Sequence, residues 1–424
     1  MTGVIGGGRD VQLEAFVDAM DLYAGDNRKP ANWHEAFRML RRYLMMRLKE
    51  GQPCIVFIDE LPCFDTHKSG FTEAFSLFWN GWAAGQAMMK LIVCGSATSW
   101  MMSNIIDSHG GLHNRITHEI HLREFTLREA EEFLHSLGLK WRRNLVLQCY
   151  MAMGGVPYYL NLLDPSLSLS QNMDHLFFSR SGELYREFHR LYNTLFSNSE
   201  PYIAVIEKLF SKKVGMTRNE IAMALKVNAN GRLTQVLRNL VDSDIVRFYS
   251  TKTRKLTARN GIYQLTDFFS LFYLQFMRNE VNDEQWWSKN IYTPRINSWR
   301  GLAFERVCIA HIAQIKHALG IDAITTTYYS WRSVLDSANA QIDIIIDRAD
   351  MLTHVCEVKY SDHEYAIDRE EYNKFTRRIA AFVQQTGTKN GIIPTFITSS
   401  GLATNSYAEQ LAVKEITLDD LFAF

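Results

Sequence analysis

Four side chains in the last third of the chain have the types and spacing that divalent-metal chemistry requires. Asp343 lies in the apolar run QIDIII, Glu357 and Lys359 lie in the later run VCEVK, and Glu305 lies upstream in GLAFERVCIAHI. Residues two apart on a strand share one face, so Glu357 and Lys359 point the same way. We expect Asp343 and Glu357 to bind Mg²⁺ through carboxylate oxygens. Glu305 would add a metal contact, and Lys359 would position and activate a water.

A glutamate and a lysine two residues apart are also common as a surface charge pair. Here both runs are apolar, and a carboxylate inside a buried strand needs a partner because burying an unpaired charge is costly. The metal site is therefore the better interpretation of Asp343 and Glu357, although such a domain can also serve only for binding.

A second acidic pair, Asp59 and Glu60, ends the apolar run CIVFI. Open α/β sheets bind ligands at this edge, where Asp59 would hold Mg²⁺ and Glu60 would orient and deprotonate an attacking water. Ser96 ends the run LIVCGS, where a polar group would contact a γ-phosphate, and Arg115 could reach the charge of a transition state. A surface turn explains the acidic pair about as well, and a surface salt bridge explains Arg115.

The elements that must carry these residues fall into four segments. A length of 424 residues predicts two or three domains. Short apolar runs alternating with helical patterns predict a parallel α/β sheet near the start of the chain, and the final block reads as a mixed α/β domain. The expected segments are a partial α/β core at 1–123, a helical region at 124–200, a winged helix with an aromatic helix at 201–280, and a mixed α/β domain at 298–424.

The third segment predicts a winged helix, because three short helical patterns precede a strand pair with the basic tip TKTRKLTARN. Its cationic side chains could contact DNA phosphates; those we single out are Arg232, Arg238, Lys252 and Arg254. A lid or docking module inside the protein explains the same pattern equally well.

Composition narrows the function classes. The net charge is zero, which argues against a uniformly basic nucleic-acid binder while allowing a local basic face. None of the six cysteines forms a CxxC pair, so we expect buried thiols in a reducing compartment rather than a zinc site. No apolar run is long enough to span a bilayer, and we expect a cytoplasmic protein with no membrane partner.

Several motifs together resemble one family. FIDELPCF, IVCGSATSWM, the arginine of LHNRI and GGVPYYL occur in the order found in prokaryotic AAA-type ATPases related to the STAND and archaeal groups. Glu305, Asp343 and the EVK triplet resemble the PD-(D/E)XK phosphodiesterase core. The resemblance extends to the C-terminus. It implies a P-loop-type ATPase domain, a winged helix and a restriction-endonuclease-like domain, with ATP as the ligand of the parent family.

The chain departs from this family at its start. No GxxxxGKS or GxxxxGKT loop occurs, and GVIGGGRD at 3–10 lacks the lysine and hydroxyl that bind phosphates and Mg²⁺. In the family, material like residues 1–23 follows that loop, so the start looks truncated, by biology or by a gene-boundary error. Two hypotheses follow: an ATPase-family protein fused to a nuclease that acts on DNA, or a non-catalytic remnant that binds a protein partner or a second copy.

We expect the chain to show no appreciable ATP hydrolysis, because the groups that hold the phosphates are absent from its sequence. The measurement is phosphate release with Mg²⁺ and ATP, with Glu60→Gln as the matched variant. A turnover of roughly 1 per second or faster that this substitution abolishes would contradict the expectation.

Overall fold

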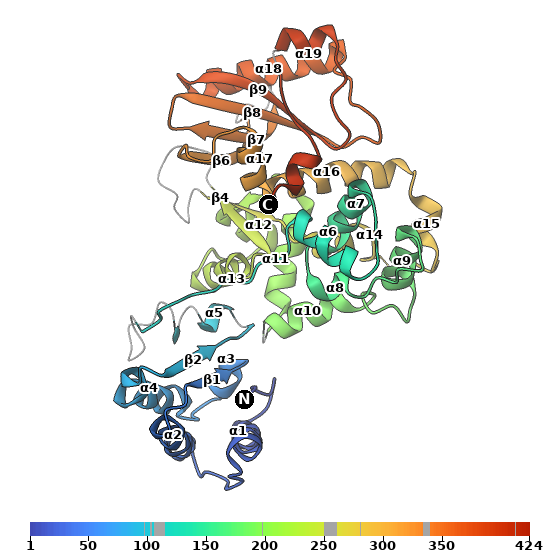
Figure 1. The fold of residues 1–424 in the computed structure, drawn as a ribbon. Helices are drawn as coiled ribbons and strands as arrows, with labels where there is room; N and C mark the ends of the chain where they lie inside the picture. Colours follow the sequence, from blue (N-terminus) through green and yellow to red (C-terminus); the bar gives the residue numbers. More distant parts are fainter. Residues whose placement is uncertain are drawn as a thin grey trace. The chain divides into compact units, whose positions relative to one another are not determined.

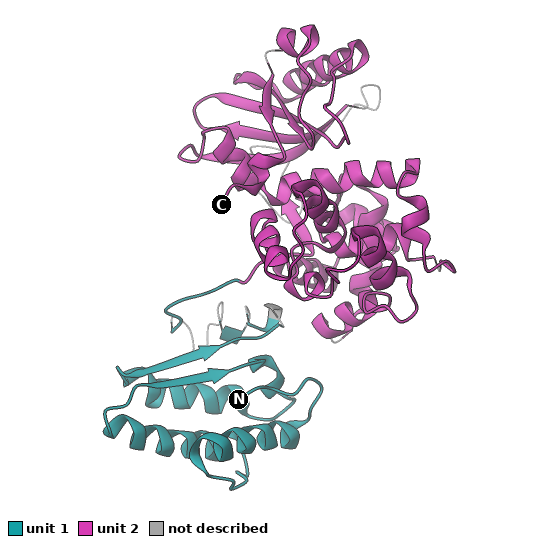
Figure 2. Cartoon of the chain, turned by 45° about the vertical axis from the view of Figure 1, so that its right-hand side comes forward, with its two compact units in different colours: residues 1–121 teal, residues 122–424 magenta. Residues whose placement is uncertain are grey.

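A computed structural model describes residues 1–96, 98–101, 104–105, 115–196, 198–249, 261–279, 281–333, 340–411 and 413–424. The chain divides into two compact units, Met1–His121 and Leu122–Phe424 (Figure 2). Each unit has its own hydrophobic core, so each is described by itself.

The first unit has a two-stranded parallel sheet, β1 with β2, and the long helices α1, α2 and α4 lie on one side of it (Figures 1 and 2). Its elements are α1 (Arg9–Ala24), α2 (Trp33–Lys49), β1 (Cys54–Ile58), α3 (Leu61–Phe64), α4 (Phe71–Gly81), η1 (Ala83–Gly85), β2 (Met89–Val93) and α5 (Thr98–Met101).

Trp33 lies at the centre of this unit's core. It begins α2 directly after Asn32, whose side chain accepts a hydrogen bond from the N–H of Glu35. Its indole is fully buried and meets Phe64 and Phe71 edge-on, at centroid distances of 5.4 and 4.9 Å. The core is therefore an aromatic cluster between the helices and one face of the sheet.

The other sheet face exposes apolar side chains. Ile55 and Phe57 on β1 are 69% and 49% exposed, and Ile92 on β2 is 47% exposed. Parallel sheets in α/β proteins are normally covered on both faces. Within the described residues of this unit, these three side chains are thus left uncovered on the second face of the sheet.

The glycine-rich segment at 4–8 forms a turn before α1. The side chain of Gln12 accepts from the N–H of Val4 at 2.9 Å and donates to the carbonyls of Val4 and Gly7 at 2.6 and 3.1 Å. The backbone of this turn is thus bonded to a side chain of the helix that follows it.

The second unit begins with a helical region. Its elements are α6 (Leu127–Ser136), α7 (Arg143–Met153), α8 (Pro157–Leu160), α9 (Leu169–Met173), the π-helical turn η3 (Asp174–Phe178) and α10 (Glu187–Leu195). The aromatic helix α14 (Phe268–Phe276), α15 (Trp286–Asn290) and α16 (Pro294–Ala310) share its core.

Three helices and a small antiparallel sheet of order β3-β5-β4 lie within the same unit. They are α11 (Glu200–Ser211), β3 (Met216–Thr217), α12 (Arg218–Leu225), α13 (Gly231–Asp242), β4 (Val246–Tyr249) and β5 (Ile262–Leu265). Thr217 and Glu220 form a capping box at the start of α12. Residues 250–260, which hold the predicted basic tip, lie outside the described residues.

The last part of the unit is a five-stranded mixed sheet of order β10-β9-β8-β7-β6, flanked by helices (Figure 1). Its elements are α17 (Ile312–Ala318), β6 (Thr326–Arg332), β7 (Gln341–Arg348), β8 (Leu352–Lys359), α18 (Arg369–Thr386), β9 (Gly391–Thr398), α19 (Ser406–Leu411), β10 (Lys414–Ile416) and η4 (Asp419–Phe422). Strands β6, β7 and β8 are antiparallel neighbours, whereas β9 is parallel to both β8 and β10.

Buried contacts tie the three-helix module to this sheet. Arg247 on β4 donates to the hydroxyl of Ser330 on β6 at 2.9 Å, and burial lowers the pKa of Arg247 to about 10. Tyr249 packs in the same cluster as Tyr329 and Trp331. The strand that leads to residues 250–260 is therefore anchored on the five-stranded sheet.

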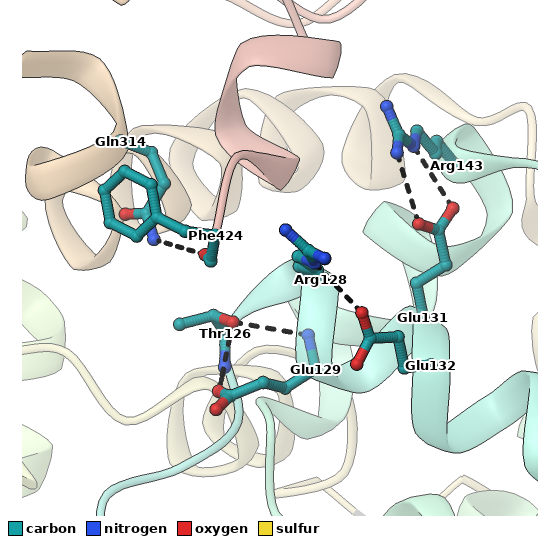
Figure 3. Close-up of polar contacts among 8 residues, drawn as sticks. All are labelled: Thr126, Arg128, Glu129, Glu131, Glu132, Arg143, Gln314 and Phe424. Atoms are coloured by element: carbon teal, nitrogen blue, oxygen red, sulfur yellow. Dashed lines mark hydrogen bonds and ion pairs between the residues drawn. The ribbon is translucent and has the colours of Figure 1, made fainter. Parts of the chain in front are cut away.

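The start of α6 is held by a capping box and by a histidine from far along the chain. Thr126 and Glu129 bond reciprocally (Figure 3). The next N–H, that of Leu127, donates to Nε2 of His311 at 2.9 Å, and Nδ1 of His311 lies 2.9 Å from the carbonyl of Val307. These contacts require the neutral tautomer with hydrogen on Nδ1, and burial lowers the pKa of His311 to about 4.

The C-terminal residues pack beside the same helix. Arg143 on α7 pairs with Glu131 on α6, and the side chain of Gln314 on α17 donates to the main-chain oxygen of Phe424 at 3.2 Å (Figure 3). Arg143 also pairs with Asp419 on η4. The turn η4 is thereby bonded to the helical region through Arg143, and Phe424 is bonded to α17.

Residues 294–318 form two helices, because α16 ends at Ala310 and α17 begins at Ile312, with His311 between them. Strand β6 was not expected, since TTYYSWR has neither strict alternation nor an apolar run. No described helix combines the length and apolar character needed to cross a membrane.

We expect the stability of the second unit to depend on pH through His311. Its folded pKa, about 4, is below the unfolded value of about 6.5, so its contribution is complete above about pH 6.5 and is lost as the pH falls toward 4. When the pH falls from about 7.5 to about 5, the free energy of unfolding should decrease in both proteins. The decrease should be about 2 kcal/mol larger in the unchanged chain than in His311→Gln.

Urea unfolding at both pH values measures this difference. His317→Gln is the matched control, because His317 is exposed beside Asp322. An equal loss in the unchanged chain and in His311→Gln would contradict the expectation.

Candidate functional site

All four side chains proposed for metal chemistry line one cavity of about 430 Å³ in the second unit. Glu305 comes from α16, Asp343 from β7, and Glu357 and Lys359 from β8. The other side chains that line it are Arg332, Ala340, Gln341, Val358 and Arg378. Residues up to 73 positions apart in the sequence therefore meet, because two helices and three strands contribute side chains to the same cavity.

The strand register explains why Asp343 and Glu357 meet. Strands β7 and β8 pair antiparallel, with Ile344 opposite Cys356. One step further, Asp343 comes opposite Glu357, and residues opposite each other lie on the same face. Oδ2 of Asp343 also accepts a hydrogen bond from the N–H of Val358 at 3.0 Å, which fixes that carboxylate against β8.

Glu357 is bonded to two cations. Nη1 of Arg378 lies 2.7 Å from each of its carboxylate oxygens, and Nζ of Lys359 lies 2.9 Å from Oε1. Lys359 is also 3.0 Å from Oε1 of Glu371. Glu371 and Arg378 are seven residues apart on α18, so they face β8 from the same side of the helix. We call Glu371, Lys359, Glu357 and Arg378 the charge ladder.

The other two carboxylates are crowded by burial and by like charge. Burial, followed by the charges of Glu357 and Glu305, raises the pKa of Asp343 well above its usual value. Burial also raises the pKa of Glu305, against the opposing effect of Arg306. Burial alone would lower the pKa of Lys359, but its pairing with Glu357 and Glu371 raises it. The ammonium of Lys359 is therefore firmly protonated.

The donor chemistry suits a hard cation, because three side chains with carboxylate oxygens share the cavity. Burial and like charge raise the pKa of two of them, and a bound cation would relieve that crowding. Their present arrangement does not form a complete metal site. Among the described residues, no three His, Cys, Asp or Glu side chains are grouped so that they could hold a metal ion. In this cavity the reason is visible, because Arg378 and Lys359 already satisfy Glu357.

In the first unit, the structure brings together three of the predicted residues. Oε2 of Glu60 accepts from the hydroxyl of Ser96 at 3.0 Å and from its N–H at 3.3 Å. Oδ1 of Asp59 accepts from the thiol of Cys94 at 2.7 Å. Glu60 has a φ of 49°, which is uncommon for a residue with a side chain. The ends of β1 and β2 thus form a small polar edge.

Arg115 is not part of that edge. It is exposed, and among the described residues of the first unit it makes no hydrogen bond to Asp59, Glu60 or Ser96. It follows residues 106–114, which lie outside the described residues, so its proposed catalytic role stays a prediction.

The predicted nucleic-acid residues are only partly described. Arg232 and Arg238 are exposed on α13, opposite its buried apolar face, and Arg238 lies 3.7 Å from Asp242. Lys252 and Arg254 lie outside the described residues. The helix therefore presents cationic side chains outward, as the sequence predicts, and their contact with DNA stays a prediction.

Sequence reasoning missed Arg378, Glu371 and Arg332. Arg378 and Glu371 lie on α18, and their spacing of seven residues can be read from the sequence. What the sequence does not give is the position of α18 over β8, which decides that this helix face meets Glu357.

No family model and no curated protein matches the chain. Among solved structures, it is similar to a Walker-type ATPase of Pyrococcus abyssi, with 17% identity and a TM-score of 0.40, over 63% of this chain and 77% of that one. A protein from Vibrio cholerae is similar at 12% identity and a TM-score of 0.21, over 93% and 80% of the two chains. Both scores are too low to establish a shared fold, so the function must be argued from the site.

We expect Glu357 and Asp343 to differ in their effect on stability when no metal is present. Glu357→Gln leaves Arg378 and Lys359 without their shared carboxylate and should lower the unfolding free energy by about 2 kcal/mol. Asp343→Asn removes a crowded like charge and should change it by less than about 1 kcal/mol or raise it. Urea unfolding with a chelator measures both; equal losses would show that the charge ladder does not hold the site together.

Proposed function

We propose that the C-terminal part of the chain is a divalent-metal-dependent phosphodiesterase that acts on DNA. One observation carries the proposal: Glu305, Asp343, Glu357 and Lys359 line a single cavity. The order of these residues along the chain and their places on a helix and two adjacent strands match the PD-(D/E)XK pattern that the sequence resembles. The proposal assigns the mixed α/β block at 298–424 to that fold and residues 201–280 to a winged helix.

In this proposal the protein residues have separate tasks. Asp343 and Glu357 would hold Mg²⁺, and Glu305 would contact it from α16. When bound, the cation would stabilise the charge that develops on the phosphate and lower the pKa of a bound water. Lys359 would remain an ammonium, because its Nζ is paired with the carboxylates of Glu357 and Glu371. As an ammonium it would donate a hydrogen bond to the phosphate or to the attacking water.

The proposed substrate is DNA because cationic side chains occur both in the cavity and on α13. Arg332 and Arg378 line the cavity, and Arg232 and Arg238 are exposed on α13. Phosphodiester backbones are bound mainly through such charges. For the first unit, we propose an ATPase-type module in which Asp59, Glu60 and Ser96 form the acidic edge, with ATP hydrolysis impaired because the sequence lacks the phosphate loop.

A second function, binding without catalysis, is favoured by one observation. Both carboxylate oxygens of Glu357 accept hydrogen bonds from Arg378, so the negative charge of this side chain is neutralised by the protein itself. A remnant that only docks DNA, a protein partner or a second copy would have no need to free this carboxylate.

The experiment that separates the two is DNA cleavage by the purified chain with Mg²⁺ or Mn²⁺. Asp343→Ala and Lys359→Ala should each lower the cleavage rate by at least about 100-fold, because each removes a group that acts at the reacting phosphate. Asp362→Asn, an exposed carboxylate three residues after Lys359, is the matched control and should cleave normally.

Cleavage that survives in Asp343→Ala and Lys359→Ala would point to another site or to a contaminant. DNA binding without any metal-dependent cleavage would favour the binding function.

A further inference from the structure

Glu357 is held by a cation that belongs to the protein. Its side chain is only 4% exposed, and both carboxylate oxygens lie 2.7 Å from the same atom, Nη1 of Arg378. A carboxylate in this setting needs a counter-ion, because an unpaired buried charge is costly. In the present arrangement, Arg378 supplies that counter-ion.

This pairing conflicts with the binding of a divalent ion at the same carboxylate. A metal ligand must bring its oxygen to roughly 2.0–2.6 Å from the ion. With Arg378 and Lys359 both within 3 Å of Glu357, the incoming ion would lie close to two positive charges in a partly buried cavity, where repulsion is strong. One of the two resident cations must therefore withdraw.

Arg378 is the one that the geometry allows to withdraw. Its pairing uses a single nitrogen, without the two parallel N–H bonds that make arginine–carboxylate pairs strongest. Its side chain is 29% exposed and extends from α18, whereas Glu357 is fixed on the inner strand β8. Lys359 is less free to leave, because Glu371 holds it from the other side at 3.0 Å.

We propose that Arg378 is a built-in competitor of the metal: it occupies Glu357 while the cavity holds no divalent ion and swings off that carboxylate when an ion binds. The released guanidinium then lies at the wall of a cavity that Arg332 also lines, where it can meet a phosphate. This inference rests on the proposed function, because it assumes that the cavity binds a divalent ion.

The test is the affinity of the full chain for Mn²⁺ without DNA, measured by calorimetry. Removing the competitor in Arg378→Gln should tighten Mn²⁺ binding at least about tenfold. Arg378→Lys, which keeps the positive charge, should stay within about threefold of the unchanged chain. Arg377→Gln, at the neighbouring exposed position of α18, is the matched control and should bind as the unchanged chain does.

The outcomes separate this inference from the function beneath it. Equal or weaker Mn²⁺ binding by Arg378→Gln, still abolished by Asp343→Ala, would overturn the competitor role and leave the metal site standing. No Mn²⁺ binding by any variant would overturn both.

A second measurement does not depend on the folding of Arg378→Gln. In the unchanged chain labelled with ¹⁵N-arginine, the Nε–H signal that disappears in Arg378→Lys belongs to Arg378. It should shift when Mg²⁺ is added; a signal that stays in place while Mg²⁺ binds would overturn the inference.

Discussion

The buried carboxylate of Glu357 must be paired, and most of the C-terminal site follows from that requirement. It lies on an inner strand of a five-stranded sheet, opposite Asp343 and beneath α18. Arg378 and Lys359 satisfy it from two directions, and Glu371 in turn holds Lys359. The position of α18 over β8 is thus coupled to the charge in the cavity, because its Glu371 and Arg378 belong to the same ladder.

Part of this site is predictable from sequence because strands have a fixed period. Glu357 and Lys359 must share a face, and an antiparallel partner strand brings Asp343 to that face once the register is set. Arg378 and Glu371 are not predictable in the same way, since their role depends on how a helix docks on a sheet through side chains far apart in the sequence. Strand β6, which supplies Arg332, was missed because its pairing with β7, rather than any pattern of its own, makes it a strand.

In the first unit, the strands can be predicted from the sequence, whereas the structure of the glycine-rich turn cannot. The runs that contain Asp59 and Ser96 predict two parallel strands, and the structure has them with Glu60 bonded to Ser96 across their ends. The glycines before α1 could be mistaken for a phosphate loop by composition alone. Gln12, which binds the backbone of that turn at three points, explains why the local structure is a closed turn. One buried side chain, and not the glycines, thus holds the turn closed.

The buried arginine Arg306 gives the cavity a physical connection to the three-helix module. It follows Glu305 on α16, lowers the pKa of that carboxyl against the effect of burial, and donates to the carbonyl of Lys213, just before β3. Because β3 and β4 both pair with β5, and Arg247 on β4 bonds Ser330 on β6, the module is joined both to α16 and to the five-stranded sheet. The module therefore touches two of the elements that line the cavity, because α16 carries Glu305 and β6 carries Arg332.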